Sequence, residues 1–359
     1  MIFNPIEVRK DNFRDAEFAL AYKGGDAAAW QQKAREKLGE LLGLPAIARK
    51  PKPVDGEFTV EWTREYETHR ETRFYFKSES GVWGLGHFLL PLNCPSPPPM
   101  IICLQGHSTG MHISQGRPLG DTFGVPAGLG GVSAEHPTKF SADEMILKQA
   151  YAVQCVSRGI AALTLEQRGM GENGGNPVDH KPACRDGIAT SALLVGRTLA
   201  GERVWDVMRS IDAALKYLPG FDPDRIGIMG VSGGGTTVLY SAILDPRIAA
   251  TFPIDCFSSY AASIGLISHC PCNYIPHVME FFDMGDLAGL IAPRPLVVSN
   301  AADDRIFPVT EAQEQFVTVK RIYQVLGAAG NCAHVIEPGG HGSYSDASWD
   351  VFLKTTGWG

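Results

Sequence analysis

The stretch Arg225-Ile226-Gly227-Ile228-Met229-Gly230-Val231-Ser232-Gly233-Gly234-Gly235 decides how this chain folds. A short apolar run enters it, and a run with helical character, residues 236–244, leaves it. The pattern predicts a buried strand, a sharp turn and a helix. Only small neighbours fit around such a turn, so the flanking glycines place Ser232 at its apex in a strained backbone conformation. The N–H groups and dipole of the following helix would favour a developing anion there.

A second stretch, Gly106-His107-Ser108-Thr109-Gly110, has the same G-x-S-x-G spacing. It follows an apolar run at 100–104, but the residues after it are glycine-rich and polar and have no helical pattern. The spacing alone is therefore a weak signal, and the strand–turn–helix context favours Ser232 over Ser108 as a nucleophile. The non-functional alternative is that Ser232 belongs to a tight strand-to-helix turn in a non-catalytic α/β protein.

Composition places the chain among ordinary globular proteins. It has 359 residues, of which 44% are hydrophobic and 20% charged, and its formal net charge is −7. No basic stripe suggests nucleic acid or an anionic membrane, and no apolar run approaches the length of a membrane span. The first residues lack the pattern of a signal peptide, and the eight irregularly spaced cysteines do not form a disulfide framework. We therefore expect a cytoplasmic protein with reduced thiols; a homo-oligomer stays open.

The order of patterns along the chain predicts an α/β fold. Residues 1–56 are expected to form a helical segment packed on the core, with a helix at 26–42 and a linker at 45–53. Residues 57–359 form the main domain, starting with antiparallel strands and continuing with alternating strands and helices that imply a mostly parallel sheet. Further expectations are a capped helix from 141 to about 158, helices at 188–199 and 202–218 split at Gly201, and loop insertions near 108–140 and 263–290.

The strand–turn–helix around Ser232 is typical of the nucleophile elbow of α/β-hydrolases, whose chain order is serine, acid, histidine. A serine hydroxyl needs a histidine to take its proton and a carboxylate to orient that histidine. The acid should follow a strand end, and Asp304, four residues before Pro308, fits this place best. Asp303 and Asp255 remain alternatives.

The histidine should also come from a loop at a strand end. His341 follows the last apolar run and has glycines on both sides, whereas His334 lies within the strand pattern itself. His341 is therefore the expected general base. The oxyanion donors are expected to be the backbone N–H groups of Gly233 and His107.

Other motifs are weaker. The stretch His269-Cys270-Pro271-Cys272, with His277 nearby, contains metal-ligating residue types. It lacks the usual two-residue gap between cysteines and a second paired half, so we expect no metal and interpret it as a lid segment lining the pocket. Arg168 is expected to anchor loops near the site by charged hydrogen bonds, and Ser108 and Val231 to line the substrate pocket.

Several short motifs together resemble the acetyl xylan esterase-like branch of α/β-hydrolases, which is related to dienelactone hydrolases. They are Gln105-Gly106-His107, residues 167–171, the elbow at 230–234, Asp304 before Pro308, Gly340-His341-Gly342, residues 200–206 and residues 292–295. The likeness covers roughly residue 57 to the C-terminus, and the N-terminal helix also suits it. It implies an α/β-hydrolase fold and a small-molecule ester substrate, with an acetylated sugar preferred.

The resulting expectation is a cofactor-free serine carboxylic ester hydrolase with a Ser232–Asp304–His341 triad. Rival enzymes with the same triad are a peptidase, a lactonase and a carbon–carbon hydrolase. A binding protein on a hydrolase scaffold without activity, and a zinc hydrolase, are the remaining alternatives.

Overall fold

The computed structural model describes residues 4–49, 57–92, 94, 96–108, 110–117, 149–174, 184, 187–342 and 346–358. Within these ranges no helix combines the length and the apolar character that a membrane crossing requires. The first eight residues of the helix expected from 141 to 158, and most of the insertion expected near 108–140, lie outside the described residues. The end of that helix is seen as α6 (Tyr151–Ser157).

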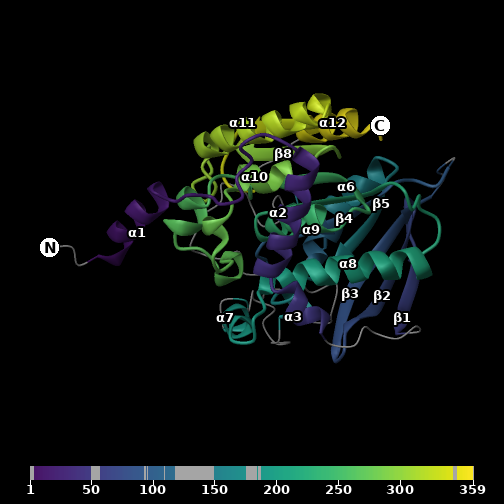
Figure 1. Cartoon of the computed structure of the whole chain (residues 1–359). Coiled ribbons are helices and arrows are strands. Elements are labelled where there is room, and N and C mark those ends of the chain that lie inside the picture. Colours follow the sequence, from purple (N-terminus) through teal and green to yellow (C-terminus); the bar gives the residue numbers. More distant parts are fainter. Residues whose placement is uncertain are drawn as a thin grey trace.

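A sheet of nine strands organises the described part of the chain (Figure 1). Its strand order is β1-β2-β3-β5-β4-β6-β7-β8-β9. The first three pairings in this order are antiparallel and the other five are parallel. The expected fold, a mostly parallel sheet with an antiparallel N-terminal edge, is confirmed. The strands are β1 (Phe58–Glu65), β2 (His69–Glu79), β3 (Val82–Pro91), β4 (Met100–Leu104), β5 (Ala161–Leu165), β6 (Ile226–Val231), β7 (Ile248–Ile254), β8 (Leu296–Ala301) and β9 (Cys332–Glu337).

The central parallel strands are buried and mostly apolar because helices cover both faces of the sheet. In β4, Met100, Ile102 and Leu104 belong to the core on one face, and Ile101 and Cys103 to the core on the other. This alternation follows from the two-residue period of a strand. A continuous apolar run of five residues therefore marks a strand buried on both sides.

Helices from distant parts of the sequence share each face. One face carries α2 (Ala27–Leu41), α8 (Leu199–Tyr217), α9 (Gly233–Leu244), α10 (Met284–Gly289) and α11 (Val309–Val325). The other carries α6 and α12 (Asp346–Thr356). The remaining helices are α1 (Pro5–Arg14), α3 (Leu44–Ala48), α7 (Ile188–Leu193) and single turns at Met111–Gln115, Gly171–Asn173, Ala261–Gly265, Pro271–Asn273, Val278–Glu280 and Ala329–Asn331.

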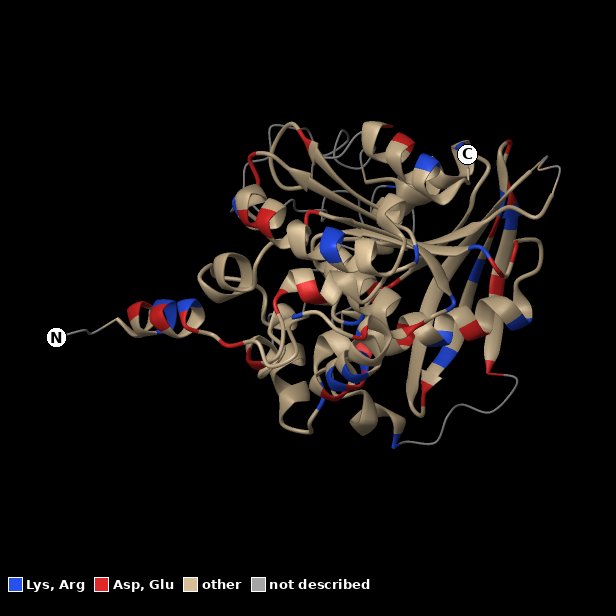
Figure 2. Cartoon of the chain, turned by 45° about the horizontal axis from the view of Figure 1, so that its top comes forward, with Lys and Arg blue, Asp and Glu red and all other residues tan. Residues whose placement is uncertain are grey.

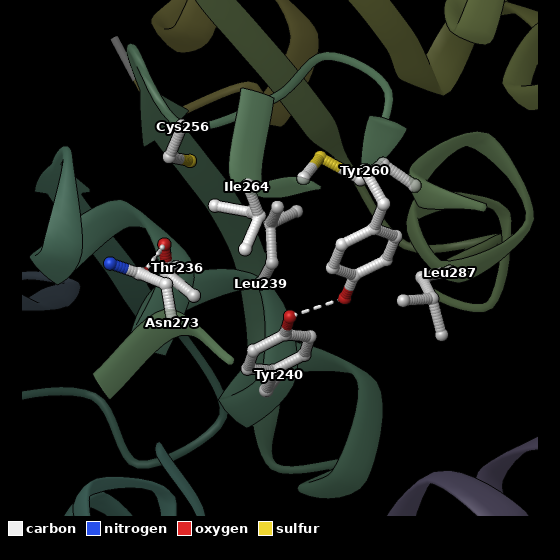
Figure 3. Close-up of a pocket in the computed structure, with 9 residues that line it drawn as sticks. Thr236, Leu239, Tyr240, Cys256, Tyr260, Ile264, Asn273 and Leu287 are labelled. Atoms are coloured by element: carbon white, nitrogen blue, oxygen red, sulfur yellow. Dashed lines mark hydrogen bonds between the residues drawn. The ribbon is translucent and has the colours of Figure 1, made fainter. Parts of the chain in front are cut away.

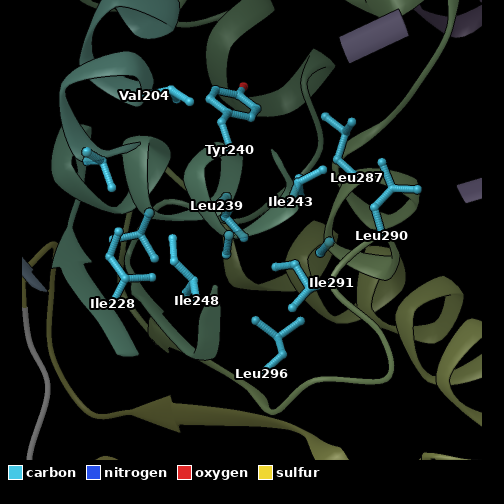
Figure 4. Close-up of a cluster of buried hydrophobic side chains, with 14 of the residues drawn as sticks. Val204, Ile228, Leu239, Tyr240, Ile243, Ile248, Leu287, Leu290, Ile291 and Leu296 are labelled. Carbon is cyan, nitrogen blue, oxygen red and sulfur yellow. The ribbon is translucent and has the colours of Figure 1, made fainter. Parts of the chain in front are cut away.

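The larger core packs the elbow helix α9 between its neighbours. Figure 4 shows Leu239 and Ile243 of α9 among side chains of the strands and of α10, including Ile228, Ile248 and Leu287. Burial of each such aliphatic side chain stabilises the fold by about 1.5–3 kcal/mol. The turn that carries Ser232 is therefore built on a rigid part of the molecule.

The N-terminal helices pack on this core, apart from α1, which buries no residue and projects from the body in Figure 1. Ala34, Leu38 and Leu42 of the α2 region are fully buried in the same cluster as α8 and α9. The stretch 45–53 was expected to be a linker, but its first residues belong to helix α3. Pro45 lies in the first turn of this helix, a position that a proline tolerates well.

The expected break at Gly201 is wrong. Helix α8 begins at Leu199 and runs through Gly201, and its cap is Thr198, whose hydroxyl accepts a hydrogen bond from Gly201 N at 2.9 Å. A Cβ on Gly201 would lie 2.0 Å from the carbonyl oxygen of Leu42. The glycine is needed because the end of α2 approaches the first turn of α8 closely, and not because the helix stops there.

Charged residues of both signs are interspersed over the surface visible in Figure 2, for example along α1 and on the antiparallel strands. This agrees with the modest net charge of −7.

Candidate active site

Ser232 occupies a strained turn between β6 and α9. Its backbone angles are φ 53° and ψ −121°, a region that costs about 1–3 kcal/mol for a residue with a side chain. The neighbouring glycines permit the turn, since a Cβ on Gly230 or on Gly234 would lie 2.4 Å from the Leu104 carbonyl oxygen. The next residue, Gly233, begins α9, so Ser232 lies at the N-terminus of that helix.

His341 and Asp304 meet at the same edge of the sheet, after β9 and β8 respectively. His341 Nδ1 lies 2.8 Å from Asp304 Oδ2. The other carboxylate oxygen, Oδ1, accepts the N–H groups of Ile306 at 2.7 Å and Phe307 at 3.2 Å, so the buried carboxylate is fixed on both sides. Burial lowers the pKa of His341, but the hydrogen bond and charge of Asp304 outweigh this and leave the pKa above its ordinary value.

The alternative acids have other partners. Asp255, with a positive φ of 46°, accepts the Ala301 N–H through Oδ1 at 2.7 Å and the Gly342 N–H through Oδ2 at 2.6 Å. Burial raises the pKa of Asp255 to about 7, although His341 opposes the shift. Asp303 is exposed, and its N–H donates to Gly339 O. Asp255 thus holds the backbone of the loop that carries His341, a role that its sequence position did not indicate.

The other candidate histidine, His334, lies within β9. Its Nε2 is 2.9 Å from Asn300 Oδ1, and burial lowers its pKa to about 4. A side chain fixed on a sheet face in this way differs from the loop position of His341.

The loop after β4 brings His107 against the elbow. A Cβ on Gly106 would lie 3.3 Å from Ser232 Cβ, and one on Gly233 would lie 2.5 Å from His107 Cε1. Neither Gly233 N nor His107 N donates a hydrogen bond to any described residue. The two residues expected to supply the oxyanion donors therefore contact each other beside the serine turn, and their N–H groups have no partner among the described residues.

Buried polar side chains join this loop to the neighbouring strand ends. Gln167 Nε2 donates to Gln105 O at 2.6 Å, and Thr237 Oγ1 of the elbow helix donates to Gln167 Oε1 at 2.9 Å. Gln105 in turn donates to Glu166 Oε1 at 2.8 Å. Burial raises the pKa of Glu166 to about 8, although the Met111 N–H that it accepts opposes the shift.

Arg168, in the loop after β5, takes part in a buried ion-pair network. From the sequence, this residue was expected to anchor loops by charged hydrogen bonds. Its Nε lies 2.7 Å from Asp206 Oδ2, and its Nη1 lies 2.6 Å from Glu79 Oε1. Val231 ends β6 beside Gly106, and Ser108 is half-buried in the loop after β4. Arg168, Val231 and Ser108 thus lie at the ends of β5, β6 and β4 or in the loops that follow them. Their contacts are with other residues of the protein and do not identify a substrate.

A cluster of thiols adjoins His107. His107 Nε2 lies 3.1 Å from Cys272 Sγ, and Cys270 Sγ lies 3.2 Å from both Cys184 Sγ and Cys272 Sγ. Hydrogen bonds from the Cys270 and Cys272 thiols hold the pKa of Cys184 well below its ordinary value. Burial lowers the pKa of His107, but the neighbouring thiols have the larger effect, so the pKa lies above its ordinary value.

The histidines next to these cysteines in sequence are not members of the cluster. His269 Nδ1 is 2.9 Å from Asn273 Nδ2, and the exposed His277 pairs with Glu280. The local pattern placed His269 and His277 beside Cys270 and Cys272. It gave no sign of His107 or Cys184, because these lie more than 80 residues away in the sequence.

The segment at 263–290 packs against the elbow helix α9 through the turn at Pro271–Asn273 and through α10; its role as a wall of the substrate pocket stays a prediction. With Thr236 and Tyr240 of α9, side chains of this segment enclose a cavity of about 10 Å³, room for roughly one water molecule (Figure 3). Asn273 contacts Thr236 at 3.1 Å, and the Tyr240 and Tyr260 hydroxyls share a hydrogen bond across the cavity. The described part of this segment thus closes the space behind the serine turn.

Known proteins share this architecture. A solved structure of a putative acetyl xylan esterase from Bacteroides fragilis NCTC 9343 superposes with a TM-score of 0.72 at 18% identity, covering 94% of this chain and 83% of that one. The glucuronoyl esterase from Solibacter usitatus gives a TM-score of 0.64 at 15% identity over 96% of this chain and 99% of that one. At such identities the likeness concerns the fold.

Two curated proteins match in sequence. "Putative hydrolase YtaP" of Bacillus subtilis (strain 168) is 26% identical over 190 residues, which are 52% of this chain and 60% of YtaP. "4-O-methyl-glucuronoyl methylesterase 1" of Sodiomyces alcalophilus is 30% identical over 152 residues, 35% of this chain and 31% of that protein. The matches thus span less than two thirds of either relative. The Abhydrolase family model, by contrast, matches residues 7–331, nearly the whole fold described above. With the nine-stranded sheet, the serine turn and this match together, the chain belongs to the Abhydrolase family.

Proposed function

We propose that this protein is a serine carboxylic ester hydrolase that works through an acyl-enzyme on Ser232, with His341 as general base and Asp304 as its orienting acid. The observation that carries the proposal is the 2.8 Å hydrogen bond between His341 Nδ1 and Asp304 Oδ2 at the sheet edge where the serine turn lies. A strained serine at a helix N-terminus and free N–H groups beside it complete the parts that acyl transfer needs.

The chemistry follows from these contacts. The Nδ1–H group of His341 donates a hydrogen bond to Asp304, which leaves the lone pair of the ring on Nε2. That nitrogen takes the hydroxyl proton as Ser232 Oγ attacks the ester carbonyl, and the Gly233 and His107 N–H groups stabilise the resulting oxyanion. His341 then returns the proton to the departing alcohol. In the second half, His341 deprotonates a water that attacks the acyl carbon and frees Ser232.

Two further groups support the site without touching the reacting atoms. Asp255 holds the backbone after His341 at Gly342 N. Arg168 fixes the loop after β5 through Asp206 and Glu79. No step of this scheme calls for a cofactor. All eight cysteines are free thiols, which fits the expected cytoplasmic, reducing location.

For the substrate, we propose a small acyl group, such as acetyl, on a carbohydrate or another small ester. The support is the fold shared with a protein described as an acetyl xylan esterase. The second candidate is the methyl ester of a sugar acid, which the partial match to a glucuronoyl methylesterase favours. In the first case the acyl-enzyme carries acetyl and the sugar leaves; in the second it carries the sugar acid and methanol leaves.

The test uses aryl acetate, butyrate and octanoate with wild type and Ser232→Ala, followed by an acetylated xylo-oligosaccharide and a methyl glucuronate ester. Acetate-preferring turnover that Ser232→Ala abolishes supports the serine esterase. Release of acetate or of methanol from the sugar substrates then separates the two candidates. Folded wild type that cleaves peptides and no esters, or that fails to react with a fluorophosphonate, contradicts the proposal.

A further inference from the structure

Four metal-ligating side chains converge beside the serine turn and take no part in the ester chemistry. They are His107, Cys184, Cys270 and Cys272, and their donor atoms all lie within 4.8 Å of one another. Cys184, Cys270 and Cys272 are almost fully buried. The four residues come from three separate segments, namely the loop after β4, the chain before α7, and the turn at Pro271–Asn273.

The spacing of these atoms is that of a closed tetrahedral zinc site. With Zn–S bonds of about 2.3 Å and a Zn–N bond of about 2.0–2.1 Å, neighbouring ligand atoms lie roughly 3.5–3.8 Å apart. The three short contacts in the cluster are 3.1, 3.2 and 3.2 Å, and the remaining ones stay within 4.8 Å. As the four donors close on one ion, the three short contacts would lengthen by about half an ångström and the longest ones would shorten by up to about 1 Å. Three cysteines and one histidine form a donor set typical of structural zinc, with no position left for substrate.

A buried cation lies near the cluster. Burial lowers the pKa of the Arg203 guanidinium, which is 2% exposed, but the charges of Cys272 and Cys184 outweigh this and raise it above its ordinary value. Its Nε donates to Arg168 O at 2.9 Å, whereas its Nη2 has no hydrogen-bond partner. A buried guanidinium with an unpaired N–H group is costly unless a negative charge lies beside it. Zinc bound by three thiolates and a neutral imidazole carries a net charge of −1, which Arg203 would balance.

We propose that His107, Cys184, Cys270 and Cys272 bind one Zn²⁺ ion, with the histidine ligating through Nε2. On binding, the three thiols lose their protons to solvent and no redox change occurs. The ion would join the loop after β4, the chain before α7 and the segment at 263–290. The segment at 263–290 is built from single turns and the short helix α10, and a shared metal is an efficient way to fix such a segment.

The site also has a consequence for the serine turn, and this part rests on the proposed function. The imidazole of His107 lies against Gly233, as the 2.5 Å approach to a Cβ built there shows. Zinc bound to Nε2 would hold this ring, and with it the backbone N–H that we assign to the oxyanion. His107 is in this respect a positioning residue: its side chain binds the metal and its main chain faces the substrate.

The binding test does not depend on activity. Protein produced with added zinc and purified without chelators is analysed for metal and for thiols accessible under native conditions. We expect about one zinc per chain for wild type and for Ser232→Ala, and near zero for Cys184→Ser and Cys270→Ser. The matched control, Cys155→Ala, removes a buried thiol outside the cluster and keeps the metal. Replacement of zinc by Co²⁺ in wild type should give tetrahedral visible bands with a thiolate charge-transfer band.

The outcomes separate the two proposals. Reduced, folded wild type without stoichiometric zinc and without the cobalt spectrum overturns the metal site, whatever its activity. A chain mass two hydrogens lighter, from a Cys184–Cys270 disulfide in place of the metal, overturns it as well. If zinc is present, its removal should lower kcat for aryl acetate by about tenfold or more with KM nearly unchanged, and added zinc should restore it. Zinc binding without any esterase activity refutes the proposed function alone.

Discussion

Replacing Asp304 by asparagine tests the proposed triad most sharply, because the structure dictates how the new side chain must sit. Oδ1 accepts two backbone N–H groups, those of Ile306 and Phe307. The amide oxygen of asparagine has to stay at that position, so its NH₂ group must face His341 Nδ1. That group donates, which forces the His341 proton onto Nε2, the nitrogen that should accept the serine proton.

The expected result is a loss of kcat/KM of about 10³- to 10⁴-fold with aryl acetate, equivalent to roughly 4–5.5 kcal/mol of transition-state stabilisation. Melting temperature should change little, since size and shape are kept. Asp303→Asn, next door but exposed, is the matched control and should stay within a few-fold of wild type. If Asp304→Asn keeps activity within tenfold while Asp255→Asn removes it, Asp255 is the triad acid and the reasoning fails.

Four other outcomes are expected. Ser232→Ala should abolish turnover and leave the fold intact, since it removes only the nucleophile; residual turnover above about 1% would argue for another serine. Activity should fall as pH decreases through the pKa of His341, which lies above its ordinary value, because the protonated ring accepts no proton; a rate independent of pH from 5 to 9 would contradict this. Gly201→Ala should lower the free energy of unfolding by about 2 kcal/mol or more in denaturant titration, since its Cβ would meet Leu42 O at 2.0 Å. Glu166 has a pKa raised to about 8 in the folded state, so its contribution to stability is complete below its ordinary pKa near 4.5 and is lost as pH rises through 8. Glu166→Gln should therefore flatten the pH dependence of the melting temperature in that window, and an unchanged slope would show that Glu166 does not titrate there.

Much of the fold could be predicted from the sequence because its signals are local. The apolar run at 100–104 is a strand with those bounds, and β6 and α9 lie on either side of Ser232 as expected. The pairing of Asp304 with His341 followed from one topological fact: in a parallel sheet, loops after neighbouring strands meet at the same edge.

What the sequence could not reveal depends on contacts between distant segments. Gly201 was expected to end a helix. The sequence alone does not distinguish a glycine that ends a helix from one that lets another segment approach closely. Asp255 stood as a rival acid because nothing local says that its carboxylate accepts two main-chain N–H groups. Cys184 carried no signal at all, since its partners lie 77 residues before it and more than 80 after it.

Asp255 also bears on how this site can change over time. One carboxyl group at the end of β7 holds Ala301, the last residue of β8, and Gly342, the residue after His341. The loop that carries Asp304 and the loop that carries His341 are therefore hydrogen-bonded to the same carboxylate. A substitution that displaces one of these loops should displace the other with it. The distance between Asp304 and His341 should therefore change little when residues of either loop are substituted. New substrate preferences could accordingly evolve through the outer residues of these loops while the proton-transfer geometry is inherited unchanged.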